Sequence, residues 1–149
     1  MKRLLQGFAA LSMVATPAFG ADGLTAIKSI YPAKETMDRF EASAKQRGLT
    51  IFARVDHAAG AAKVGKTLRP TEVIVFGNPM GGTPLMECAQ SAGIDLPLKA
   101  LVWEDDKGQV WLGYNDPAFL ARRHGVPQCP AIDGLDKALS GLAAASIAR

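Results

Sequence analysis

Apolar and polar residues alternate along the chain in a way that predicts several strands. In residues 49–55 apolar side chains recur at nearly every second position, as in a strand with one face on a core. Residues 71–76 form a run rich in β-branched side chains, which is typical of a central strand. Residues 99–104 and 109–114 flank the sequence DDKG, so they predict a β-hairpin in which Gly108 takes the positive φ of a tight turn.

Apolar residues spaced at three and four positions predict helices around these strands. A first strand at residues 24–30 precedes them. The predicted helices are, in chain order, Pro32 to Gly48, a short turn at residues 56–62, Asp116-Pro117 to Gly125, and a last helix whose apolar stripe runs from Ile132 to Ile147. The hairpin requires antiparallel pairing while helices separate the earlier strands. We therefore expect an α+β fold: a single domain with an antiparallel-containing sheet of about five strands and helices packed on one face.

The N-terminus has the three parts of a secretory signal peptide. Lys2-Arg3 supply positive charge, residues 4–15 are apolar, and residues 16–20 end in small residues suited to cleavage between Gly20 and Ala21. The apolar part is short for a membrane span, which takes about 20 residues. We expect a bacterial protein that is periplasmic or secreted, with no stable membrane association after cleavage; an uncleaved anchor is the alternative.

Removal of residues 1–20 leaves residues 21–149 as one domain. The formal charge falls from +3 to +1, because the signal peptide contains two basic residues and no acidic residue. The remaining length suits one hydrophobic core rather than two. Basic residues are scattered apart from Arg122-Arg123-His124, and few aromatic residues lie among them, so nucleic-acid binding has no support.

The chain contains two cysteines, Cys88 and Cys129. In an oxidising compartment two cysteines in one domain often pair, and a bridge closing a loop of about 40 residues would stabilise the fold by about 4 kcal/mol. Two buried free thiols, or one thiol acting as a ligand or nucleophile, are the alternatives.

The stretch IVFGNPMGGTPLMEC, residues 74–88, has glycines placed like those of a phosphate-binding loop. Gly77 and Gly82 match the first and last glycines of G-x-x-x-x-G-K-[ST], but Thr83-Pro84 stands where Lys-Ser/Thr should be. No ammonium is then available for the phosphates. We interpret Thr83 as an N-cap with Pro84 as the first helical residue, and the glycines as a shaped turn that brings side chains to a pocket.

Nearly all of the chain after the signal peptide resembles the bacterial DUF302 family. The resemblance rests on four stretches: RVDHAAGAAKVG at 54–65, LRPTEVIVFGNPMGGTPLME at 68–87, IDLPLKALVWEDDKGQVWLGYNDP at 94–117, and the opening strand and helix. It implies a compact α+β fold of the type β-α-β(4)-α, and some members of the family are dimers. It implies no activity, since the family is largely uncharacterised.

Four polar residues near strand ends are candidates for a binding or catalytic site. Asp56 and His57 follow the second strand, Asn78 follows the third, and Glu87 lies on the helix after it. If these strands are neighbours, the side chains could converge at one rim of the sheet. Each also has a structural interpretation: Asp56 as a helix cap, Asn78 as a partner of its own turn, His57 as a structural histidine and Glu87 as a helix-dipole partner.

Other chemistry has weaker signals. His57, Met80, Met86 and Cys88 are types that soft copper prefers, but the sequence has no C-x-x-C or H-x₃-H pair, and we expect no cofactor or metal. Ser91 and Ser140 lie in helical contexts without the G-x-S-x-G of a hydrolase. Trp103 and Trp111 lie on the two hairpin strands and would stack across it, line a dimer face or pack in the core.

The sequence is best interpreted as an exported DUF302-type protein that binds a small ligand or another protein. Whether it forms a homodimer is left open. The alternatives are a small periplasmic enzyme that uses His57 with Glu87 or Asp56 as acid and base, and a copper-type metal-binding protein.

Overall fold

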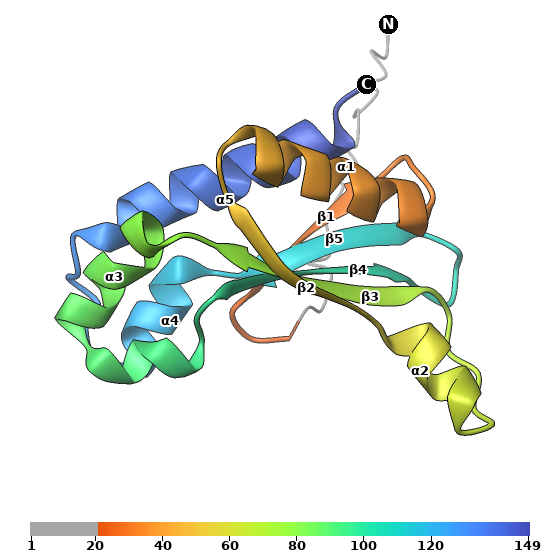
Figure 1. The fold of residues 1–149 in the computed structure, drawn as a ribbon, viewed down its shortest axis with the longest axis horizontal. Helices are drawn as coiled ribbons and strands as arrows, with labels where there is room; N and C mark the ends of the chain where they lie inside the picture. Colours follow the sequence, from red (N-terminus) through yellow and green to blue (C-terminus); the bar gives the residue numbers. More distant parts are fainter. Residues whose placement is uncertain (1–20) are drawn as a thin grey trace, which may run out of the picture.

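Two long helices lie on one face of a five-stranded sheet in the computed structural model, which describes residues 21–149 (Figure 1). The elements are β1 (Leu24–Ser29), α1 (Ala33–Gln46), β2 (Thr50–Asp56), α2 (His57–Lys63), β3 (Thr71–Gly77), α3 (Pro79–Cys88), the 3₁₀ helix η1 (Gln90–Ile94), β4 (Leu98–Glu104), β5 (Val110–Asn115), α4 (Pro117–Arg123) and α5 (Ala131–Ile147). The predicted signal peptide, residues 1–20, lies outside the described residues. Within residues 21–149, the helices are all too short or too polar to cross a membrane.

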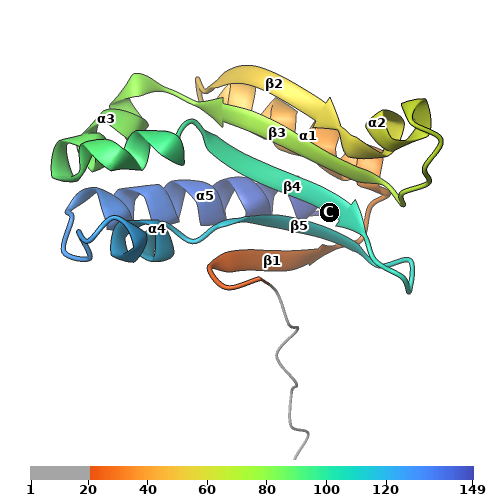
Figure 2. The same cartoon turned by 90° about the horizontal axis from the view of Figure 1, so that it is seen from below.

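The strand order is β1-β5-β4-β3-β2, and every neighbouring pair is antiparallel. β1 and β2 are therefore the two edge strands, and α1 carries the chain from one edge to the other (Figures 1 and 2). This arrangement confirms the predicted α+β fold with an antiparallel sheet of five strands.

The main core lies between the sheet and the helices α1 and α5. Met37 and Phe40 on α1 and Leu139 and Leu142 on α5 are at most 1% exposed, because the apolar stripes of both helices face the strands. Phe40 meets Phe76 of β3 edge to face, with ring centroids 5.1 Å apart. A smaller cluster, which contains Leu85 of α3 and Leu135 of α5, shares Leu98 of β4 with this core.

Glycines confirm three predicted boundaries: the ends of α1 and α4 and the turn between β4 and β5. Gly48, Gly108 and Gly125 have φ values of 73°, 75° and 73°, which side chains with a Cβ rarely adopt. The start of α3 differs from the prediction: Asn78, not Thr83, is the N-cap, Pro79 is the first helical residue, and Pro84 lies inside the helix. Both Asn-Pro and Thr-Pro suit a helix start, and the chain begins the helix at the earlier pair.

A β-bulge in β2 changes which residues face the core. The register shifts between Ile51 and Ala53, so Arg54 stands opposite buried Ile74 whereas Val55 points to the other face. Simple alternation predicted the reverse for these two residues. As a result, the face of β2 that is turned toward the core carries the charged side chain of Arg54.

Candidate functional site

An apolar cavity of about 530 Å³ opens between α3 and α5, over the ends of β2 and β3 where Thr50 pairs with Gly77. Its lining residues are Leu49, Phe52, Phe76, Gly77, Asn78, Pro79, Met80, Gly81, Gly82, Thr83, Met86, Gly93, Leu96, Pro97, Leu98, Leu135, Ala138, Leu139 and Leu142. None of these residues is charged. Phe52 and Met80 are 55% and 87% exposed, so part of the apolar lining is open to solvent.

The glycine-rich stretch that resembled a phosphate loop forms one wall of this cavity. The Gly81 N–H donates to Asn78 Oδ1 over 2.8 Å, so it is not free for an anion. A Cβ at Gly81 would lie 3.3 Å from the same oxygen, so glycine allows this close approach. The stretch lies at a cavity, as expected, but only Gly77 and Asn78 form the turn, and Gly81 and Gly82 belong to the first turns of α3.

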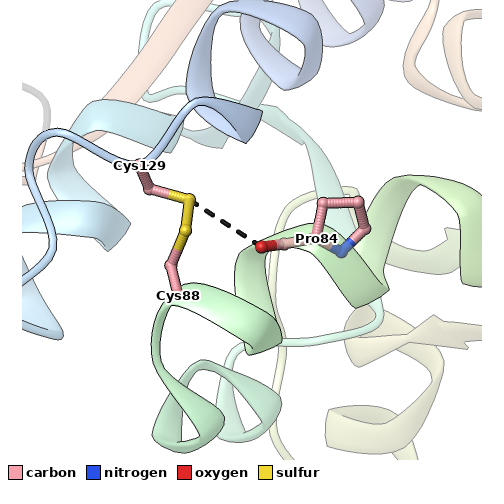
Figure 3. The surroundings of a disulfide bond; sticks show 3 residues. All are labelled: Pro84, Cys88 and Cys129. Carbon is pink, nitrogen blue, oxygen red and sulfur yellow. Dashed lines mark hydrogen bonds between the residues drawn. A yellow bond between two sulfur atoms is a disulfide. The ribbon is translucent and has the colours of Figure 1, made fainter.

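Cys88 and Cys129 lie at disulfide distance, as the sequence analysis expects, with their Cα atoms 6.0 Å apart (Figure 3). Cys88 is the last residue of α3, and Cys129 lies just before α5. Because α3 and α5 form facing walls of the apolar cavity, the bridge joins these walls covalently.

Four side chains form a polar brace between η1 and α4, beside the cavity wall that contains Leu96: Ser91, Asp95, Arg123 and His124. His124 Nε2 lies 2.6 Å from Asp95 Oδ2, its Nδ1 lies 2.9 Å from Ser91 Oγ, and Arg123 donates to Asp95 Oδ1 over 3.0 Å. These are the residue types of a hydrolase triad, but Ser91 does not line the apolar cavity. The brace instead holds Asp95 beside Leu96, which does line the apolar cavity. Sequence reasoning missed it, because residues so far apart give no local signal.

The four candidate polar residues do not converge. β2 and β3 are neighbours, but they are antiparallel: Asp56 pairs with Glu72 at one end, and Gly77 pairs with Thr50 at the other. The two ends of this pair are roughly 20 Å apart. His57 and Asp56 therefore lie at α2, while Asn78 and Glu87 lie at α3 on the opposite side of the molecule (Figure 1).

Asp56 and Asn78 both act as helix caps. Asp56 Oδ1 accepts the Ala59 N–H at 2.8 Å at the start of α2. Asn78 does the same for Gly81 at the start of α3. The cap was predicted for Asp56, whereas Asn78 was expected to bond to its own turn and Thr83 to be the N-cap.

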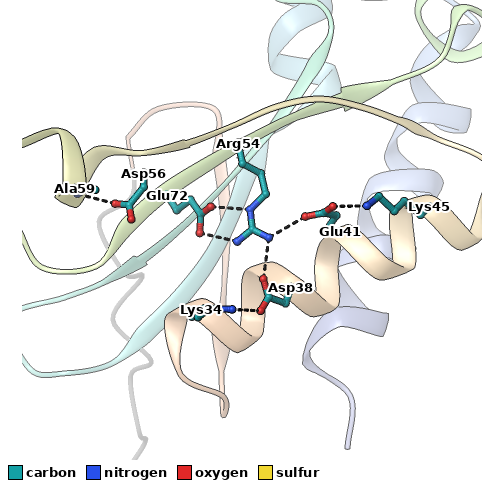
Figure 4. A network of polar contacts seen from close by, with 8 residues as sticks. All are labelled: Lys34, Asp38, Glu41, Lys45, Arg54, Asp56, Ala59 and Glu72. Carbon is teal, nitrogen blue, oxygen red and sulfur yellow. Dashed lines mark hydrogen bonds and ion pairs between the residues drawn. The ribbon is translucent and has the colours of Figure 1, made fainter.

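A second cavity of about 420 Å³, lined by charged as well as apolar side chains, lies at the Asp56 end of the strand pair, which is the polar end. It is lined by Ala33, Lys34, Arg54, Asp56, Ala58, Leu68, Pro70, Thr71, Glu72 and Val102. At its wall, the Arg54 guanidinium binds both carboxylate oxygens of Glu72, at 2.6 and 2.9 Å (Figure 4). It also donates to Asp38 and Glu41 of α1, each over 2.8 Å.

This ion-pair network shifts the pKa values of its members. Hydrogen bonds that Arg54 donates to Glu72, and then those to Asp38 and Glu41, raise the pKa of Arg54 even though burial lowers it. The pKa of Asp38 is lowered by Lys34 and Arg54, and that of Glu41 by Lys45 and Arg54. The lowered pKa values keep Asp38 and Glu41 charged at neutral pH, and Arg54 binds both of them together with Glu72, so the network joins α1 to the β2 edge.

Trp103 and Trp111 stack on the sheet face away from α1 and α5. They are paired across β4 and β5, with ring centroids 6.3 Å apart and planes 15° apart. Their neighbours Val102 and Leu112 point into the core, so the tryptophans point outward. Stacking across the hairpin is confirmed, and packing in the core is wrong. No described helix covers this outer face (Figure 2).

The copper hypothesis loses one of its ligands, because Cys88 faces Cys129 at disulfide distance. Among residues 21–149, His, Cys, Asp and Glu side chains form no group of three that could hold a metal ion. His57 and Met80 also lie at opposite ends of the β2–β3 pair.

Comparison with known proteins identifies the family. The profile of the family described as "Domain of unknown function DUF302" matches residues 25–142. The chain belongs to the DUF302 family. The crystal structure of an uncharacterized conserved DUF302 protein from Bacillus stearothermophilus has the same fold: its TM-score is 0.76 at 20% identity, over 85% of this chain and 99% of that one.

Curated relatives of this DUF302 chain carry the name of a membrane protein. "Fluoride-specific ion channel FluC 1" of Brucella suis is 51% identical over 104 residues, which are 70% of this chain and 41% of that protein. FluC 1 of Brucella abortus and FluC 2 of Brucella melitensis match equally, over 38% of each. The chain thus spans about two fifths of the length of these relatives.

Proposed function

We propose that this protein binds a small, uncharged, apolar molecule in the cavity between α3 and α5. The observation that carries the proposal is the lining itself: leucine, methionine, phenylalanine and glycine residues surround about 530 Å³, and none of the lining residues is charged. Burial of apolar surface contributes about 0.8 kcal/mol per CH₂ group, whereas a charged ligand would lose its hydration without a counter-charge.

Fluorescence of N-phenyl-1-naphthylamine, a neutral apolar probe, tests this function. The probe should brighten and saturate at one molecule per chain. Native mass spectrometry of freshly purified protein should reveal any molecule retained from the cell. A probe that stays dark at every protein concentration would contradict ligand binding.

Export to the periplasm or beyond is part of the same proposal. It is supported by the signal-peptide pattern of residues 1–20 and by the placement of Cys88 and Cys129, which suits an oxidising compartment. Mass spectrometry of the mature protein should give an N-terminus at Ala21. A chain that keeps residues 1–20 in the cytoplasm would contradict export.

A homodimer through the outer face of the sheet is a second proposal. That face presents Leu101 and Val73 beside the tryptophan pair, and a second copy would bring an identical apolar face to form a sandwich of two sheets. Sedimentation should detect a dimer that Leu101→Lys disrupts. A wild-type protein that sediments as a monomer at all concentrations would exclude it.

The names of the Brucella relatives suggest a partner as well. We propose that this chain acts beside a fluoride channel of its own cell, since its sequence is half identical to part of proteins with that name. The apolar cavity itself offers no charged side chain to a fluoride ion. Deletion of the gene should lower the fluoride concentration that stops growth, and unchanged tolerance would exclude this partnership.

A further inference from the structure

Asn78 is a lining residue of the apolar cavity, and its side-chain amide carries one hydrogen-bond donor group whose orientation is fixed. Its Oδ1 accepts the Gly81 N–H at 2.8 Å, and only the oxygen of an amide group can accept. This bond therefore fixes which end of the amide is the oxygen and which is the nitrogen. The Nδ2 group, with its two hydrogens, is therefore the end of the amide that points away from the Gly81 N–H.

The Nδ2 group of Asn78 is free to bind something else. In the described part of the chain, Nδ2 has no bonded acceptor. Every buried side-chain nitrogen or oxygen there does have a partner, so Nδ2 is not buried, and solvent or a ligand can reach it. Thr83 is the other polar side chain of the lining, and its hydroxyl can both donate and accept. Asn78 is thus the lining side chain whose free group can only donate.

We infer that the cavity selects uncharged molecules that combine an apolar body with a carbonyl-type oxygen, such as ketones, esters and quinones. This inference rests on the proposed function and adds the chemical class of the ligand. The apolar walls hold the body of the molecule, and its oxygen accepts a hydrogen from Asn78 Nδ2. A hydrocarbon of the same shape would displace water from this donor without replacing the bond.

Two matched probes test the inference. 2-Acetylnaphthalene and 2-ethylnaphthalene have nearly the same shape, but only the first carries a carbonyl oxygen. In competition with N-phenyl-1-naphthylamine, the ketone should bind about fivefold more tightly than the hydrocarbon, because a net neutral hydrogen bond is worth roughly 1 kcal/mol. Equal affinities of the two probes for the wild-type protein would overturn the inference.

Asn78→Asp removes the donor and keeps the helix cap. Aspartate still accepts the Gly81 N–H, but its carboxylate cannot donate. The added charge will weaken both probes, so the ratio of their affinities is the quantity to compare. That ratio should fall to one or below. Thr83→Val is the matched control, since it removes the hydroxyl with little change in volume, and it should keep the wild-type ratio. A ratio that survives N78D or disappears in T83V would contradict the role of Asn78.

A measurement on the wild-type protein covers the case in which N78D does not fold. In ¹⁵N-edited NMR spectra, the side-chain amide signals of Asn78 should shift with 2-acetylnaphthalene and much less with 2-ethylnaphthalene. Identical shifts with both probes would overturn the inference. If N-phenyl-1-naphthylamine and both naphthalenes fail to bind at all, the proposed function itself is wrong. If they bind without a preference for the ketone, only the inference about Asn78 fails.

Discussion

The two ends of the β2–β3 pair differ in charge: the cavity at one end has charged side chains in its lining, and the cavity at the other end has none. At the Asp56–Glu72 end, the cavity of about 420 Å³ is bordered by Arg54 and carboxylates that already bind one another. At the Thr50–Gly77 end, the cavity of about 530 Å³ is apolar, and the side-chain Nδ2 of Asn78 in its lining makes no hydrogen bond within the described residues.

This difference makes the apolar end, rather than the polar end, the proposed ligand site. Arg54 makes four hydrogen bonds to three carboxylates, so a ligand at the polar end would have to break existing bonds before it made new ones. A ligand at the apolar end would displace only water from the walls and would complete the bonding of Asn78. Charge alone is thus a poor guide to function in this protein.

Loss of the bridge between Cys88 and Cys129 should give the largest effect. The double variant Cys88→Ala, Cys129→Ala should lose about 4 kcal/mol of the free energy of unfolding, since the bridge closes a loop of 41 residues. Probe affinity should also fall, because α3 and α5 are no longer joined. The measurement is urea unfolding without reductant. Wild-type protein treated with dithiothreitol should behave like the variant, and a variant as stable as the oxidised wild type would contradict the bridge.

Replacement of Arg54 should lower the stability of the protein at the Asp56–Glu72 end and leave ligand binding at the apolar end unchanged. Arg54→Met leaves Asp38, Glu41 and Glu72 without their shared partner, and the free energy of unfolding should fall by about 2 kcal/mol, since the Arg54 side chain is only 27% exposed. Binding of N-phenyl-1-naphthylamine should stay within twofold of wild type. Loss of probe binding in this variant would show that the two ends are coupled and would break the comparison.

A large side chain in the apolar cavity should change binding without changing stability. Ala138 of α5 lines the cavity and is exposed, so Ala138→Phe should cover its mouth and weaken the probe at least tenfold. Such surface changes usually alter the free energy of unfolding by less than about 0.5 kcal/mol. The matched control is Ala145→Phe, an exposed position of the same helix outside the lining. Equal affinities of the two variants would place the probe elsewhere.

Periodicity and end signals were enough to predict the strands and helices, because each depends on neighbours in the sequence. The cap at Asp56 was predictable for the same reason, but the cap at Asn78 was not, because Asn78-Pro79 and Thr83-Pro84 carry the same local signal. The direction of β2 relative to β3 was not, and antiparallel pairing alone separated His57 from Asn78. The Arg54 network and the cavity also escaped prediction, since a one-residue bulge turned Arg54 inward and the cavity walls come from distant segments.

The smallest effect should be a difference in pH dependence between the wild type and Arg54→Met. The pKa values of Asp38 and Glu41 are lowered in the folded protein, first by Lys34 and Lys45 and then by Arg54. A depressed folded pKa contributes stability that is complete above the unfolded values near about 4 and is lost as pH falls through the folded values. Removing Arg54 removes part of that contribution, so the two free energies of unfolding should converge between about pH 5 and pH 3.

Urea unfolding of both proteins across this pH range measures the convergence. Lys34 and Lys45 remain in the variant, so some pH dependence should persist there as well. Probe affinity should stay constant over the range in which both proteins remain folded, because no titratable side chain lines the apolar cavity. Parallel stability curves would mean that Arg54 stabilises the polar end by packing of its aliphatic stem rather than by charge. A pH-dependent probe affinity would mean that the charges of the polar end affect binding in the apolar cavity.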